Sequence, residues 1–146
     1  HLGMMGRLGS TVRDEQGLAY YVSSSLRPGH GPYPWNVVAG VNPGKIDQAV
    51  AGILYELQRL RDEPVSDQEF EDCKAFLTGS LPLRLETNEG IAGFLLNAQE
   101  YELGLDYLQR YPSIIGAVTR EGIQRVARKY LTPERYVLAM AGTFAE

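Results

Sequence analysis

The sequence predicts an α+β fold, in which helices pack on one face of a mostly antiparallel sheet. Two runs rich in aromatic and β-branched residues flank a Pro/Gly-rich turn at 27–34, which is typical of a hairpin. From residue 46 onward, apolar residues recur at intervals of three and four, which indicates helices. The chain has 146 residues, so we expect a single domain with one core over 1–146.

The first predicted element is a short helix that ends at Gly17. Residues 1–16 mix glycines with Leu8, Val12 and Arg13, which predicts a loop running into this helix. Glycine commonly follows the last helical residue because it adopts left-handed backbone angles without strain.

The hairpin is predicted to have strands at 18–26, LAYYVSSSL, and 35–41, WNVVAGV. Successive side chains of a strand point to opposite faces. We therefore expect Leu18, Tyr20 and Val22 on one face of the first strand.

A long helix should follow the hairpin. Asn42 and Pro43 form an N-cap and first-turn pair, and an apolar stripe runs behind them from Ile46 to Leu60. The tripeptide DEP at 62–64 should end this helix.

A second helix should begin where Ser66 and Glu69 form a capping box. It should place Cys73 in the core as a small apolar residue, and Pro82 should bend or end it.

Three further helices and a strand complete the prediction. One helix starts at Thr87 or Asn88 and reaches about residue 103, and another, over 106–118, is interrupted near Pro112. Thr119 should cap the last helix, and the run at 136–142 should form a buried strand. The residues of the last helix that we expect to face inward are Ile123, Val126, Ala127 and Tyr130. Because three strands are few for so many helices, we expect the chain to be a fragment that lacks N-terminal strands of the sheet.

Composition argues against nucleic-acid binding and against a membrane segment. The net charge is −4, the pI is near 5.2, and the 14 basic residues are scattered, so the sequence predicts no basic face. No run approaches the roughly 20 apolar residues of a membrane helix. The single Cys73 excludes an internal disulfide. The compartment stays open between cytoplasm, which is slightly favoured, periplasm and mitochondrion.

The sequence also lacks the motifs of a self-contained catalytic or metal site. Its two histidines are the terminal His1 and His30 in the turn, and it has no HExxH, HxxEH or GxSxG motif. The glycines at 3, 6 and 9 do not follow a strand, so they are not a dinucleotide fingerprint. Glu86 and Glu89 are explained by a helix start. We therefore expect no metal and no cofactor in this chain.

Arg13 and Tyr20 are the strongest candidates for a functional role. On the pattern alone, Arg13 pairs with Asp14, Glu15 or a distant carboxylate, and the ring of Tyr20 packs on the sheet. A guanidinium and a phenol are, however, donors that a site uses to hold a carbonyl or a developing oxyanion. The residue pattern leaves both interpretations open.

The segment GRLGSTVRDEQGLAYYVSSS (6–25) resembles the C-terminal, non-catalytic half of the insulinase/pitrilysin family of zinc peptidases. The match lies in Arg7-Leu8, in the tract Arg13-Asp14-Glu15 and in a tyrosine seven residues after Arg13. It continues through AGVNPGKIDQA, SDQEFEDCKAFLTGSL, LETNEGIA and YLTPERYVLAMAG, and so covers nearly the whole chain. The family's usual serine before Arg7 is replaced by Gly6, which affects the detail of this loop.

This resemblance implies a clamshell of two similar halves, of which the chain is the zinc-free one. The zinc ligands would belong to a catalytic half, on the same chain or a separate subunit, and this half would close over a peptide substrate. Arg13 and Tyr20 would reach the substrate near the scissile bond, and the isolated chain would have no activity. The alternative is a pseudo-peptidase module that serves assembly without proteolysis. A homodimer is a further expectation, because a missing partner exposes apolar surface and sheet edge.

Overall fold

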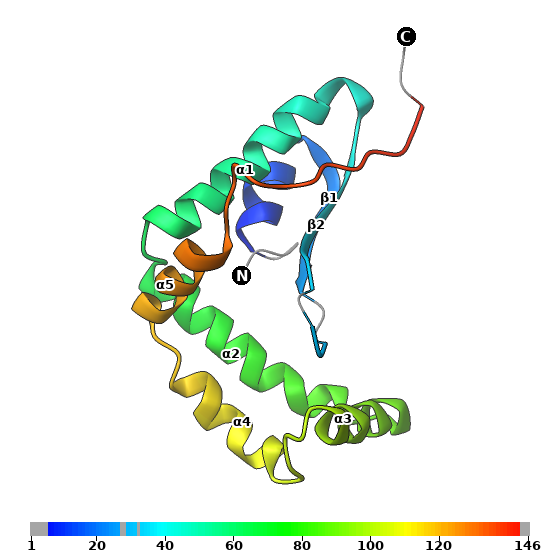
Figure 1. Ribbon diagram of the computed structural model, residues 1–146, viewed down its shortest axis with the longest axis vertical. Coiled ribbons are helices and arrows are strands. Elements are labelled where there is room, and N and C mark those ends of the chain that lie inside the picture. Colours follow the sequence, from blue (N-terminus) through cyan, green and yellow to red (C-terminus); the bar gives the residue numbers. More distant parts are fainter. Residues whose placement is uncertain (1–5, 27–28, 32, 144–146) are drawn as a thin grey trace. The chain divides into compact units, whose positions relative to one another are not determined.

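The structure is a computed structural model that describes residues 6–26, 29–31 and 33–143 (Figure 1). His1, Gly3 and part of the predicted turn at 27–34 lie outside the described residues. The chain divides into two compact units. The first comprises the chain up to Glu63 together with the chain from Arg125 onward, and the second is Pro64–Gln124. The predicted α+β class is confirmed, with helices and a two-stranded antiparallel sheet among the described residues.

The first element of the sheet-bearing unit is η1 (Gly9–Glu15), a short helix of π type. Gly17 follows it with φ of +58°, as predicted for a glycine helix stop. The amide of Gly17 donates to the Arg13 carbonyl at 3.1 Å, and that of Leu18 donates to the Val12 carbonyl at 2.9 Å. These bonds satisfy carbonyls at the helix end and turn the chain directly into the first strand.

The predicted hairpin is confirmed as β1 (Ala19–Leu26) paired antiparallel with β2 (Trp35–Val41). Its ladder is irregular near the start, because Ala19 pairs with Val41 whereas Tyr21 pairs with Gly40. Tyr20 is thus the extra residue of a β-bulge.

The bulge corrects the prediction that Leu18, Tyr20 and Val22 share one face. Leu18, Ala19 and Val22 are buried, whereas Tyr20 is exposed. An extra residue shifts the alternation of a strand by one position, so both Tyr20 and its neighbour Tyr21 lie on the side away from the core.

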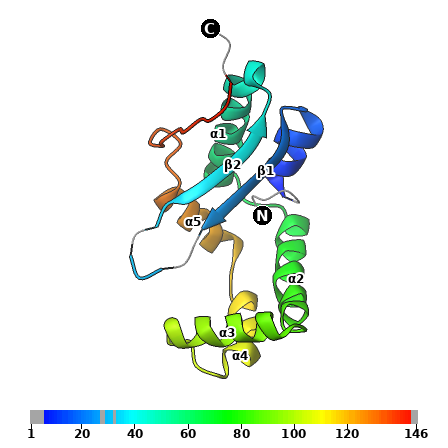
Figure 2. The ribbon, with the colours of Figure 1, turned by 90° about the vertical axis from the view of Figure 1, so that its right-hand side faces the viewer.

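The long helix α1 (Ile46–Asp62) begins as predicted, after the short 3₁₀ turn η2 (Pro43–Lys45). The Asn42 side chain caps η2 by accepting the Gly44 amide at 3.0 Å. Helices η1 and α1 lie on one face of the hairpin (Figure 2). A buried cluster fills the space between them and the strands, formed by Leu8, Val12, Leu18, Ala19, Val22 and Ala49. The prediction of helices on one face of the sheet is confirmed within this unit.

The second unit contains α2 (Asp67–Arg84), α3 (Asn88–Glu100) and α4 (Tyr107–Gly116). Ser66 and Thr87 cap α2 and α3 by accepting the amides of Glu69 and Gly90 at 3.2 and 3.0 Å. Thr119, the predicted cap of α5 (Arg120–Tyr130), accepts the Gly122 amide at 3.0 Å.

Two details of these helices differ from prediction. Pro112 lies inside α4, which continues past it without interruption. Pro82, predicted to bend or end α2, lies inside this helix two residues before its last residue, Arg84. Cys73 is half-buried and not a core residue, because α2 has no buried side chain.

The predicted inward stripe of α5 is also narrower than expected. Ala127 is buried and Ile123 half-buried, whereas Val126 and Tyr130 are exposed. Polar contacts hold this end of the helix instead, since Arg128 Nε donates to the Arg61 carbonyl of α1 at 3.0 Å.

The predicted closing strand at 136–142 is wrong. Residues 136–141 have no regular secondary structure, and Val137 is 96% exposed. A strand exists only where its backbone pairs with a neighbouring strand, and neither strand of the described hairpin pairs with this segment.

Among the described residues, no helix is long and apolar enough to span a bilayer.

Candidate functional site

The candidate site is the frame that runs from Arg13 on η1, through the Gly17 turn, to Tyr20 on β1. A helix end, one left-handed residue and a strand bulge set the directions of the two side chains. Lys45 Nζ donates to the Gly17 carbonyl at 3.2 Å and so ties the turn to the chain before α1.

Tyr20 is strongly exposed. Its side chain is 90% exposed, compared with 44% for Tyr21 beside it. No hydrogen bond of the Tyr20 hydroxyl appears among the described residues. The interpretation in which this ring packs on the sheet is therefore wrong, and the phenol is open to an incoming group.

Arg13 forms one of the pairs that the sequence allowed. Its Nε donates to Asp14 Oδ1 at 2.7 Å, and the two side chains are 34% and 55% exposed. An ion pair at the surface contributes little, about 0 to 1 kcal/mol, so it does not lock the guanidinium. The described contacts of Arg13 use Nε alone and do not join it to Tyr20, so the structure does not link the two donors directly.

The frame is held from below by the buried cluster. Leu8, Val12 and Val22 are all fully buried; Leu8 is the N-cap of η1, Val12 lies in the middle of η1, and Val22 belongs to β1. Helix α1 packs closely on η1 at Gly52, where a Cβ would lie 3.5 Å from Val12 Cγ2 and 3.0 Å from Gln16 Oε1. The donors thus stand on the best-packed part of the described chain.

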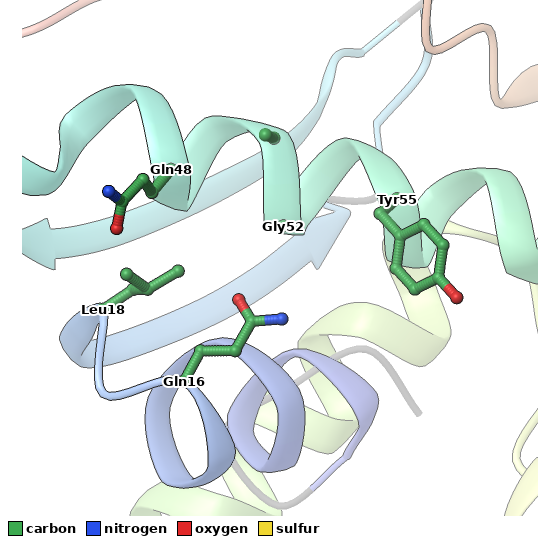
Figure 3. Close-up of a pocket in the computed structure, with 6 residues that line it drawn as sticks. Gln16, Leu18, Gln48, Gly52 and Tyr55 are labelled. Carbon is green, nitrogen blue, oxygen red and sulfur yellow. The ribbon is translucent and has the colours of Figure 1, made fainter.

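An open hollow lies beside the Gly17 turn, on the α1 side (Figure 3). Its volume is about 480 Å³. Gln16 and Leu18 approach it from the end of η1, and Gln48, Gly52 and Tyr55 approach it from α1. None of its lining side chains carries a charge.

No cluster of three or more His, Cys, Asp or Glu side chains placed to hold a metal occurs among the described residues. Glu89 lies in the first turn of α3, where Thr87 is the cap, so the helix-start explanation of this acidic segment is confirmed.

Sequence reasoning missed one buried charge, Glu56 of α1, which is 0% exposed. Arg59 Nη1 donates to its two carboxylate oxygens at 3.0 and 3.3 Å. Burial alone acts to lower the pKa of Arg59, but hydrogen bonds and charges from Glu63 and Glu56 outweigh it and raise this pKa. The signal in the sequence was a glutamate on the same helical stripe as Ile53 and Leu60.

The fold defines the class of protein to which this chain belongs. An antiparallel hairpin covered on one face by helices (Figure 2) has the features of an α+β domain. The sequence matches the family described as the peptidase M16 inactive domain over residues 2–77, and the chain belongs to that family. The resemblance to zinc-peptidase inactive domains is thereby confirmed.

Known relatives agree with this assignment. A Bacillus subtilis (strain 168) protein named "Probable inactive metalloprotease YmfF" is 24% identical over 127 residues, which is 87% of this chain and 29% of that protein. The chain therefore spans about a third of the length of such relatives.

Solved structures share the fold. A peptidase M16 inactive domain from Pseudomonas fluorescens has 24% identity and a TM-score of 0.78 over 90% of this chain and 31% of its own. A conserved protein from Enterococcus faecalis V583 has 28% identity and a TM-score of 0.72 over 86% of this chain and 29% of its own. A protease from Helicobacter pylori has 21% identity and a TM-score of 0.77 over 90% of this chain and 32% of its own.

Proposed function

We propose that this chain is part of the substrate-binding, zinc-free half of a clamshell metalloendopeptidase. Its partner is a catalytic half, on the same chain or on a separate subunit, and its ligand is a peptide. Arg13 and Tyr20 supply hydrogen bonds to that peptide near the bond that is cut.

The observation that carries the proposal is the exposure of Tyr20 on a bulge. A phenol that is 90% exposed gains nothing from packing, and the bulge interrupts the ladder to place it there. Bulges are frequent beside functional sites because they aim a side chain away from the regular alternation of the strand. Membership in the inactive-domain family supports the division of labour with another half.

The roles of the two donors follow from their chemistry. A zinc ion in the catalytic half would polarise the attacking water. Tyr20 donates its hydroxyl proton in a hydrogen bond to the carbonyl oxygen as negative charge develops there. Arg13, whose planar guanidinium presents several N–H donors, holds a neighbouring substrate carbonyl.

The test is turnover by the full protein with its catalytic half. Tyr20→Phe should lower kcat with little change in KM, by about one to three kcal/mol of barrier, which is roughly 5- to 150-fold. Arg13→Ala should also lower turnover, whereas Tyr33→Phe, at an exposed tyrosine near the hairpin turn, should not. Unchanged turnover in both Tyr20→Phe and Arg13→Ala would reject the donor roles. The isolated chain should bind no stoichiometric zinc and cleave no peptide.

A second candidate is a pseudo-peptidase module that serves assembly without proteolysis. The name of the Bacillus subtilis relative, an inactive metalloprotease, favours it. The two candidates differ in one feature, the presence of an HxxEH motif in the rest of the protein or in a partner. If neither contains the motif, the assembly role is the correct one.

A further inference from the structure

We propose that Gly40 and Tyr21 form a positioning contact that fixes the direction of Tyr20. This inference rests on the proposed role of Tyr20 and adds to it two positioning residues, neither of which needs to touch the substrate.

The contact is a ring seated on a glycine. Tyr21 and Gly40 stand directly opposite each other in the ladder. A Cβ on Gly40 would lie 2.4 Å from Cε1, 2.9 Å from Cδ1 and 3.1 Å from Cζ of the Tyr21 ring. The ring therefore occupies the space that any side chain at position 40 would fill. The contact between this ring and Gly40 also explains why Tyr21 is only 44% exposed, although Tyr21 lies on the face away from the core.

This contact pins the ladder at the residue after the bulge. On the other side of Tyr20, Ala19 is buried and pairs with Val41, so the extra residue is held between two fixed neighbours. Strand register is specified by such cross-strand contacts, and aromatic rings over glycine are one way to set it.

The same contact disfavours the alternative registers. If the ladder slipped by one residue, Tyr21 would face Ala39 or Val41 in place of Gly40. Each of these residues carries a Cβ, so the ring would lose the open space that it has over Gly40. Of the seven residues of β2, WNVVAGV, only Gly40 lacks a Cβ.

The experiment uses the full protein with its catalytic half and three single variants. Gly40→Ala expels the ring, and Tyr21→Ala removes it. Val38→Ala is the matched control, because Val38 lies on the same strand, pairs with Ser23 and is 52% exposed. We measure kcat and KM, and we measure backbone amide exchange over 19–26 by mass spectrometry.

We expect Gly40→Ala and Tyr21→Ala each to lower kcat about tenfold with KM unchanged, and the double variant to be no worse than either one. Amide exchange in 19–26 should rise in both variants and stay at the wild-type rate in Val38→Ala.

The outcomes separate this inference from the proposed function. If Tyr20→Phe slows turnover but Gly40→Ala does not, the positioning contact is rejected and the donor role of Tyr20 stands. If Tyr20→Phe has no effect, the donor role is rejected, and amide exchange alone decides the contact. Wild-type exchange in Gly40→Ala would overturn it in either case.

Discussion

The two units of the chain differ in where their apolar side chains lie. The sheet-bearing unit has a continuous buried cluster that includes Leu8, Val12 and Val22, all fully buried. In the helical unit, α2 and α4 have no buried side chain, and α3 has only Ala98. The rigid packing is thus concentrated beneath Arg13 and Tyr20, the two residues that we propose as donors, and such packing would hold their side chains in fixed directions.

Polar and aromatic contacts join the helices of the helical unit. Lys74 Nζ donates to the Gly116 carbonyl at 3.0 Å and so joins the middle of α2 to the C-terminal end of α4. The rings of Phe94 and Tyr107 stack at 6.3 Å between centroids, and Tyr107 meets Tyr111 edge-on at 5.8 Å. Several large apolar side chains of this unit stay exposed, among them Phe76, Leu83 and Leu96. The helical unit thus leaves several of its large apolar side chains in contact with solvent, in keeping with its few buried residues.

The largest expected loss of stability comes from truncating a side chain in the core of the sheet-bearing unit. Leu8→Ala should lower the free energy of unfolding by about 2 to 5 kcal/mol, because it leaves a cavity beneath η1. Leu95→Ala in α3, where the side chain is 47% exposed, should cost less than about 1 kcal/mol. Urea denaturation measures both. Equal losses would show that packing does not distinguish the units.

The next effect concerns the ion pairs of the two units. Arg59→Ala leaves the buried Glu56 carboxylate without its charged partner and should destabilise the protein by about 3 kcal/mol. Arg110→Ala breaks the Arg110–Asp106 pair of the helical unit, which is exposed on both sides, and should cost much less. Thermal unfolding of the two variants provides the measurement. A larger shift in Tm for Arg110→Ala would reverse the comparison.

Loss of a helix cap should lower the free energy of unfolding by a similar amount in the two units. Ser66→Ala removes the acceptor for the Glu69 amide at the start of α2 and should cost about 1 kcal/mol. Asn42→Ala removes the corresponding cap in the sheet-bearing unit and should cost a similar amount. The rate of amide exchange in the first turn of each helix measures how far the loss of the cap destabilises that turn. A loss of exchange protection that spread through α2–α4 in Ser66→Ala would show that this unit depends on its caps more than expected.

The smallest effect is the pH dependence of an exposed pair. The hydrogen bond from Arg110 lowers the pKa of Asp106. A carboxyl with a lowered folded pKa contributes stability above its unfolded pKa, about 3.9. This stability is lost as the pH falls through the lower, folded value. Titration of the Asp106 carboxyl by NMR should give a midpoint below the ordinary value, and Arg110→Ala should raise it. An unchanged midpoint in Arg110→Ala would remove the cause assigned here.

Local signals predicted much of the fold because they act over a few residues. The helix stop at Gly17 and the caps at Asn42, Ser66, Thr87 and Thr119 each depend on one side chain or backbone angle and a nearby amide. The hairpin follows equally well from its β-rich runs and turn. Each of these predictions is confirmed.

The predictions that are wrong concern segments whose structure depends on residues far away in the sequence. The run at 136–142 is apolar enough for a strand, but pairing needs a free neighbour, which a local pattern does not report. The predicted inward face of α5 is too wide. Ala127 is buried and Arg128 donates a hydrogen bond to the Arg61 carbonyl, whereas Val126 is exposed. At the candidate site, Arg13 and Tyr20 were chosen from the sequence, but the bulge that exposes Tyr20 depends on pairing with β2. Their donor roles stay a prediction.

The ladder shows what the sheet would look like without Tyr20. Removing this single residue would bring Ala19, Tyr21 and Val22 into an unbroken inward, outward, inward alternation, with Val41, Gly40 and Ala39 opposite them. The strand would then be regular, and its buried side chains would keep their places. Tyr20 is therefore a residue that the sheet does not require and accommodates at a local cost in regularity. A strand shortened by this residue should form a more regular hairpin, so selection for stability alone would not retain Tyr20.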